Sequence, residues 1–487
     1  MTLPPSGAFA PMKILIEHLA FAITCDASDR VIEDASLVIE DDRIAAIGSS
    51  DEIERGHSRE SCHLIRDGRR YGMTPGFIDA HVHLSEMLSR GVYPDDVNTR
   101  EWVFNWAMPF YAHLGSEDES VGALLTIAEM LRSGTTCFLD MGSQSDVSVT
   151  ALAIETSGIR GITGRHAADQ LPKSIPPGWP PGIERRHFFP SAEAALEALA
   201  SAVKQWDGKA DGRIRCWVNI QGKEPCSLAL HIGARCVAEQ LGVGSTYHLA
   251  SSQEETSGSI RNFGVGPVGR IAAHGGLGSN LVLAHAAAVS EQEIELLAEA
   301  GTKVAFCPGT SLKLAKGATS IGKYPEMMAQ GITVALGTDG PSASGNLSLM
   351  RQMYLVAGLF KDARLDATKI GARQALRMAT IDGARALLLD DTIGSLAAGK
   401  KADFVLFDLD HTEWTPYVDP VQSLVWSASP ASIAETWVNG RRLFFDGQVA
   451  TLDERAIRQE ARQRALALRQ RARLRPQTGK VTAEAYA

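Results

Sequence analysis

In the segment TPGFIDAHVHLSEML (Thr74–Leu88), an apolar strand-like run is followed by two histidines. An apolar run with one charged residue, Asp79, leads directly to His81 and His83, which are separated by one position. Because alternate residues of a strand point to the same face, both imidazoles are expected on one side of the strand end. The segment therefore predicts a polar site at the end of an otherwise buried strand.

Seven more strand-like segments follow, and several are separated by amphipathic stretches such as SVGALLTIAEMLRSG (120–134) and SEQEIELLAEAG (290–301). Repeated strand–helix units are typical of a parallel sheet, and eight of them predict a (β/α)8 barrel over residues 72–385. The seven segments are GTTCFLDMG (134–142), IRGITGR (159–165), IRCWVNIQ (214–221), GSTYHLAS (244–251), LVLAHAAA (281–288), KVAFCPG (303–309) and ITVALGTDG (332–340).

Short strands with turn residues between them occur at both ends of the chain. Residues 12–71 and 386–450 have this character, and Asn439-Gly440 is a strong hairpin signal. We expect both ends to combine in one small β-sandwich domain. Residues 451–487 are expected to form a helical tail that packs on this chain or on a second copy, which favours a homo-oligomer.

Composition excludes several classes of protein. The 487 residues carry a formal net charge of -9, and no basic stripe precedes the C-terminal tail, which argues against a nucleic-acid partner. The N-terminus has no signal-peptide or membrane-spanning pattern. Seven scattered cysteines without a CxxC motif indicate reduced thiols and a cytoplasmic protein.

Histidines and one aspartate end several of the predicted barrel strands. In such barrels the functional groups gather at the C-terminal ends of the strands, so these side chains are expected to converge. Imidazole nitrogens with a carboxylate suit a divalent transition metal, which lowers the pKa of a bound water to about 7. The residues are His81 and His83 on the first strand, His248 on the fifth, His285 on the sixth and Asp339 on the eighth.

The order and spacing of these motifs resemble the amidohydrolase superfamily, in its branch of triazine hydrolases and aromatic deaminases, over residues 12 to 450. The resemblance implies a distorted (β/α)8 barrel with a sandwich from both ends, and a divalent metal ion, one or two per subunit (zinc, cobalt, iron or manganese). It implies metal ligation by His81, His83, His248 and Asp339. It also implies that His285, at the metal site, holds the attacking water or the oxyanion, and that Asp339 is the general base.

Two positions depart from the pattern of that branch. Deaminases there usually carry a glutamate three residues after the fifth-strand histidine, where this chain has Ser251. At the end of strand four, Gln221 stands near the place where many deaminases have a substrate-binding histidine, and it is a candidate substrate-binding residue together with Trp106. Lys223 follows it as a candidate carboxylated lysine that would bridge two metal ions, the alternative being a solvent-exposed loop lysine.

Aromatic residues in the loop after strand one, Trp106 among them, favour an apolar pocket and a small neutral hydrophobic substrate. The segments NIQGKEPCS (219–227) and HLASSQEET (248–256) are similar to the molinate and phenylurea herbicide hydrolases of the superfamily. We therefore expect hydrolysis of a C–N or C–S bond at the carbonyl of an amide, urea or (thio)carbamate. The alternatives are hydrolytic deamination or dechlorination of an amino-heterocycle, and a non-catalytic scaffold.

Overall fold

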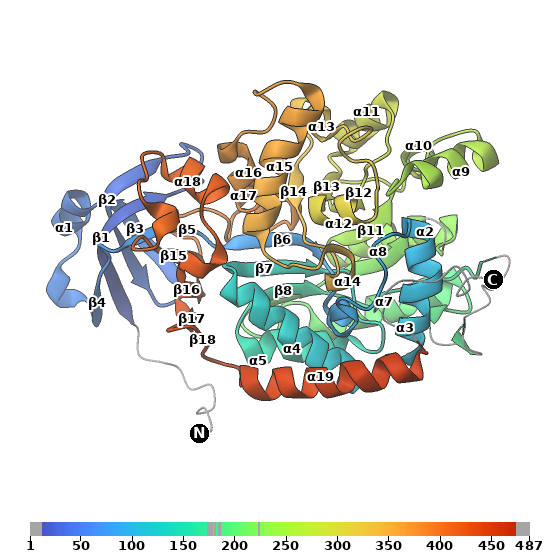
Figure 1. Ribbon diagram of the computed structural model, residues 1–487, viewed down its shortest axis with the longest axis horizontal. Coiled ribbons are helices and arrows are strands. Elements are labelled where there is room, and N and C mark those ends of the chain that lie inside the picture. The colour runs from blue at the N-terminus through green and yellow to red at the C-terminus, as the bar shows by residue number, and fades with distance from the viewer. Residues whose placement is uncertain (1–11, 173–178, 180–181, 184–186, 223–224, 474–487) are drawn as a thin grey trace.

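The computed structural model describes residues 12–172, 179, 182–183, 187–222 and 225–473. Strands from both chain ends form one sheet domain, and the chain between them forms an α/β barrel (Figure 1). The barrel strands are β6 (Phe77–Val82), β7 (Thr135–Asp140), β8 (Arg160–Thr163), β9 (Ile214–Cys216), β10 (Val218–Gly222), β11 (Ser245–Leu249), β12 (Leu281–His285), β13 (Lys303–Phe306) and β14 (Val334–Leu336).

All pairings between neighbouring barrel strands are parallel, in the orders β6-β7-β8-β9 and β10-β11-β12-β13-β14. Strands β9 and β10 are two pieces of the fourth strand, which is interrupted at Trp217. The Asp339 backbone N–H donates to the His81 carbonyl at 2.8 Å and joins the eighth strand position to the first. The approach requires Gly337, because a Cβ there would lie 2.9 Å from that carbonyl oxygen. The prediction of a distorted (β/α)8 barrel is confirmed.

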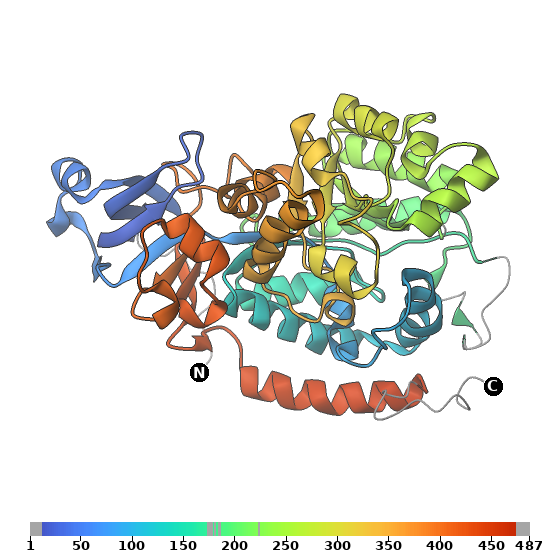
Figure 2. The ribbon, with the colours of Figure 1, turned by 45° about the horizontal axis from the view of Figure 1, so that its top comes forward.

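Helices follow the barrel strands and cover the outside of the barrel (Figure 2). Their ends agree with local sequence signals: α8 begins after the capping Ser227 and ends at Gly242 in the left-handed conformation. The covering helices include α4 (Ser116–Arg132), α5 (Val147–Ser157), α7 (Ala192–Trp206), α8 (Leu228–Leu241), α9 (Gln253–Phe263), α10 (Pro267–Ala272), α11 (Glu291–Ala300), α13 (Tyr324–Ala329), α15 (Leu349–Arg364), α16 (Ala372–Met378) and α17 (Ile381–Ala386).

The sheet domain has the strand order β18-β17-β16-β15-β5-β1-β2-β3, with β4 paired to β1. A buried ion pair connects it to the barrel: Arg160 on β8 lies 3.1 Å from Asp403, just before β15. Its strands are β1 (Lys13–Ile23), β2 (Val31–Glu40), β3 (Arg43–Ser49), β4 (Leu64–Asp67), β5 (Tyr71–Pro75), β15 (Phe404–Asp408), β16 (Ile433–Val438), β17 (Arg441–Phe445) and β18 (Gln448–Val449).

The C-terminal helix α19 (Glu454–Arg471) runs along the barrel beside α4 (Figures 1 and 2). Arg464 and Arg471 both pair with Asp118 on α4, and Leu468 is fully buried. The predicted tail helix therefore packs on its own chain.

Two further features bear on the sequence predictions. None of the helices in the described ranges is long and apolar enough to cross a membrane. All seven cysteines lie in those ranges and are free.

Candidate active site

Five side chains converge at the C-terminal ends of the barrel strands. His81 lies on β6, and His83 directly follows it. His248 lies on β11, His285 ends β12, and Asp339 follows β14. The potential ligand atoms of His81, His83 and His248 all lie within 4.8 Å of one another, and so do those of His81, His285 and Asp339. Parallel pairing of the strands produces this convergence, as the sequence predicts.

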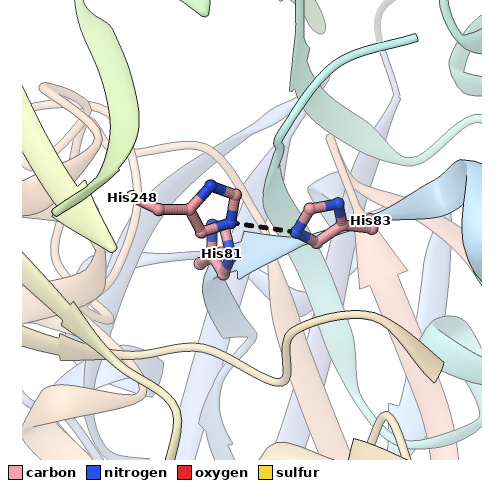
Figure 3. Close-up of side chains that lie close together, drawn as sticks. All are labelled: His81, His83 and His248. Atoms are coloured by element: carbon pink, nitrogen blue, oxygen red, sulfur yellow. Dashed lines mark hydrogen bonds between the residues drawn. The ribbon is translucent and has the colours of Figure 1, made fainter. Parts of the chain in front are cut away.

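The imidazoles of His83 and His248 face each other with their Nε2 atoms 3.3 Å apart, beside His81 (Figure 3). His248 Nδ1 lies 2.6 Å from the Gln221 carbonyl oxygen, which can only accept, so Nδ1 carries the proton. Burial, followed by the neighbouring His81, lowers the pKa of His248 to about 3, and the same two causes hold the pKa of His83 well below its usual value. Neutral rings with their Nε2 lone pairs turned toward a common point are suited to a cation.

Asp339 supplies the carboxylate of the cluster. Its Oδ1 lies 3.4 Å from His83 Nε2 and 3.7 Å from His81 Nε2, and its Oδ2 lies 3.6 Å from His285 Nε2. Burial by itself would raise the pKa of Asp339, but the nearby imidazoles of His81 and His285 hold it well below its usual value. Asp339 and His285 also have positive φ angles of 62° and 72°, and such strained backbone is common at functional sites.

These residues fit a divalent metal ion. His81 is fully buried, yet neither of its ring nitrogens has a hydrogen-bond partner within the described parts of the chain. A buried polar atom without a partner is costly, and a metal ion would remove that cost. Three imidazole nitrogens and one carboxylate oxygen are a suitable ligand set for zinc or a similar ion.

Glu86, which the sequence reasoning missed, supports His83 from the cavity side. Its Oε1 lies 3.4 Å from His83 Nδ1 and accepts a hydrogen bond from the Tyr111 hydroxyl, while Oε2 accepts from Ser342. A carboxylate at Nδ1 orients a metal-binding histidine and directs its Nε2 lone pair to the metal. Burial, followed by the proximity of Asp339, raises the pKa of Glu86 to about 8. Its position three residues after His83 was the only signal in the sequence.

Lys316, also missed, lies against the other side of the cluster. Its Nζ is 3.0 Å from His285 Nε2, and its side chain is almost completely buried. The residue follows α12 (Pro308–Lys313) in the loop after β13. Nothing in the local sequence distinguishes it from the nearby Lys313.

The cluster opens into a cavity with a largely apolar outer wall. Ser251, at the position where deaminases of the branch carry glutamate, lines this cavity, and the backbone N–H groups of Ala250 and Ser251 donate to the Glu255 carboxylate. Those contacts occupy both oxygens of Glu255. The lining residues include His83, Glu86, Trp102, Phe104, Ala107, Tyr111, His166, Gln221, His248, Ser251, Glu254, Glu255, His285, Leu314, Lys316, Asp339 and Ala343.

The other predicted site residues have different outcomes. Gln221 lines the cavity, and its carbonyl orients His248. Trp106 lies in the π-helical turn η3 (Trp102–Ala107) and packs beside Tyr93. Trp102 and Phe104 of the same turn line the cavity in its place. Lys223 lies outside the described residues, so its carboxylation stays a prediction.

Comparison with known proteins gives consistent results. The model of the amidohydrolase family matches residues 73–443. The 5-methylthioadenosine/S-adenosylhomocysteine deaminase of Thermoanaerobacter pseudethanolicus is 31% identical over 463 residues, which cover 94% of this chain and 100% of that protein. A zinc-bound adenosine deaminase from Xanthomonas campestris superposes with a TM-score of 0.83 at 27% identity, covering 95% of this chain and 99% of that one.

A zinc complex of an atrazine chlorohydrolase from Arthrobacter aurescens has the same fold. Its TM-score is 0.82 at 24% identity, covering 93% of this chain and 99% of that one.

Proposed function

Because this chain belongs to the amidohydrolase family and is an enzyme that acts on carbon–nitrogen bonds, we propose that it is a hydrolytic deaminase. In the proposed reaction, water replaces the amino group on a ring carbon of an amino-heterocycle, such as an aminopurine. The observation that carries this proposal is the cluster of three histidines and Asp339 in a chain that matches a 5-methylthioadenosine/S-adenosylhomocysteine deaminase over 94% of its length.

The expectation of a phenylurea, amide or (thio)carbamate substrate is not supported by these relatives. It depended on Ser251, on Lys223, on an apolar pocket and on the similarity of residues 219–227 and 248–256 to herbicide hydrolases. The loss of a single glutamate does not exclude deamination if another side chain can supply a hydrogen bond at the same step.

The cavity supports a flat and neutral substrate. Trp102 and Phe104 offer aromatic surface, and Leu314 and Ala343 add aliphatic surface. Aromatic rings stack well on heteroaromatic ones, and a mostly apolar wall favours an uncharged ligand. This part of the proposal retains the sequence-based expectation of a small neutral hydrophobic substrate.

The proposed mechanism assigns one task to each group. His81, His83, His248 and Asp339 would hold zinc or a similar divalent ion, which lowers the pKa of a coordinated water. Asp339 has one oxygen toward the histidines and the other toward His285, so it can accept the proton of the attacking water and return it to the leaving amine. His285 would orient that water.

Product analysis of the purified, zinc-loaded enzyme tests the proposal. Adenosine, 5′-methylthioadenosine and an aminotriazine are compared with a phenylurea, and ammonia and aniline are measured. We expect ammonia from at least one amino-heterocycle and no such activity in Asp339→Asn prepared in parallel. Aniline release from the phenylurea, with no ammonia release from any of the amino-heterocycles, would refute the proposal and favour attack on a carbonyl.

A further inference from the structure

Lys316 brings a positive charge to the inner wall of the cavity. Its side chain is 5% exposed and lines the cavity together with His285 and Asp339. Within the described residues, the one hydrogen bond of its side chain joins Nζ to His285 Nε2 at 3.0 Å. The mechanism proposed above assigns no role to this lysine.

An ammonium group carries three N–H donors, and His285 accepts only one of them. Burying the group is unfavourable unless acceptors or negative charges compensate for the loss of water. At least one donor therefore remains for a molecule in the cavity.

The glutamate that donates to the substrate ring in the deaminase pattern is absent from this chain. The deaminase pattern expects a glutamate at position 251 to act on a ring nitrogen, and this chain has Ser251. Glu255, close in sequence, accepts the N–H groups of Ala250 at 2.9 Å and Ser251 at 2.8 Å. Both oxygens of the Glu255 carboxylate thus accept backbone N–H groups, and the neutral Ser251 hydroxyl is a weaker donor than a charged group.

Building on the proposed function, we propose that Lys316 replaces the missing glutamate as the donor to the substrate ring. Its ammonium donates a hydrogen bond to the ring nitrogen next to the carbon under attack. In a 6-aminopurine these two atoms are N1 and C6. Lys316 is then a catalytic residue of this enzyme.

In the proposed step, water adds to C6 and ammonia leaves. The water oxygen forms a bond to C6 as its proton passes to Asp339, and the C6–N1 π pair moves to N1. The negative charge on N1 faces the Lys316 ammonium. Asp339 then protonates the amino group, the N1 pair restores the C6–N1 double bond, and the C6–N bond breaks to release ammonia. A fixed charged donor at the atom where charge develops stabilises the transition state more than the ground state.

Binding of two analogues that lack the leaving amino group tests this contact without turnover. Purine riboside has N1 but no amino group, and 1-deazapurine riboside has a CH group in place of N1. Calorimetry on the zinc-loaded enzyme should show that purine riboside binds about tenfold to a hundredfold more tightly, as expected for a charged hydrogen bond. In Lys316→Met the two analogues should bind equally. Lys323→Met is the matched control, because Lys323 pairs with Glu291 on the surface and is expected to keep the full difference.

The same variants give the kinetic readout. Lys316→Met should lower kcat about a hundredfold or more for ammonia release while zinc content and melting temperature stay close to wild type. Ethylammonium added to Lys316→Ala should restore part of that activity, because it can occupy the space left by the side chain.

The outcomes separate this inference from the proposed function. If wild type releases ammonia but Lys316→Met still distinguishes the two analogues, the inference is wrong and the proposed function stands. If Lys316→Met loses zinc, or binds 1-deazapurine riboside much more weakly than wild type does, Lys316 only supports His285 and the inference is also wrong. If wild type releases ammonia from no amino-heterocycle, the proposed function fails first and the inference fails with it.

Discussion

Truncation of Glu86 to alanine tests how the fold holds His83 in place. Glu86 is 1% exposed, and its carboxylate lies 3.4 Å from His83 Nδ1 while accepting from Tyr111 and Ser342. Alanine removes the acceptor for all three donors. We expect Glu86→Ala to bind zinc more weakly, because His83 can then rotate and its Nδ1 proton loses its partner.

The expected size follows from these contacts. Removing a partner that orients a metal-binding histidine typically weakens metal affinity about 10- to 100-fold, or roughly 1.4 to 2.7 kcal/mol. Each donor left unpaired costs about 1–3 kcal/mol of stability, reduced here because water can enter from the adjacent cavity. Glu86→Gln keeps one acceptor oxygen and should lose less than tenfold in zinc affinity.

Chelator competition measures the zinc affinity, and Glu119→Gln is the matched control. Glu119 is equally buried and accepts backbone N–H groups of Gln144 and Ser145, but it contacts none of the clustered histidines. That variant should melt at a lower temperature and keep its zinc affinity. Wild-type zinc affinity in Glu86→Ala would refute the role of Glu86 as the support of His83.

Three further changes test other parts of the molecule. Asp339→Asn should lower kcat at least 10²- to 10⁴-fold with an unchanged circular dichroism spectrum, because the general base is lost; activity near wild type would contradict the mechanism. His231 is buried on α8, and burial lowers its pKa to about 4. Between about pH 6.5 and pH 4 this imidazole is therefore protonated in the unfolded chain and neutral in the folded one. The free energy of unfolding should therefore fall by about 2 kcal/mol from pH 7 to pH 5 because of this group. In His231→Phe, urea unfolding should show a decrease that is smaller by this amount. Arg160→Met should lower the melting temperature, because it leaves Asp403 buried without its cation at a cost of about 3–5 kcal/mol; unchanged melting would mean that the pair contributes nothing to the contact between barrel and sheet domain.

Residues on strands were the predictable part of the site. His81, His83, His248 and His285 could be placed together from the sequence because strand periodicity fixes the side-chain direction and parallel pairing aligns the strand ends. Asp339 follows the eighth strand closely enough for the same reasoning to hold. Trp106 could not be placed this way, because the π-helical turn of η3 changes which residues face the cavity.

Glu86 and Lys316 depended on contacts between distant segments. Glu86 becomes a functional candidate only when Tyr111 on α3 (Met108–His113) and Ser342 on α14 (Pro341–Ser344) donate hydrogen bonds to its carboxylate. Lys316 differs from Lys313 only in its surroundings. Lys316 Nζ contacts His285, whereas Lys313 Nζ donates to the Ser342 carbonyl at 2.7 Å.

The sequence by itself determined the barrel, the sheet domain shared by both chain ends and the metal-binding character of the strand ends, because these follow from periodicity and residue type. Only the tertiary structure decided which acidic and basic side chains complete the site, because loop residues acquire their environment from segments far away in the chain. The pKa of Glu86 and the burial of Lys316 are properties of that environment, and no local pattern encodes them.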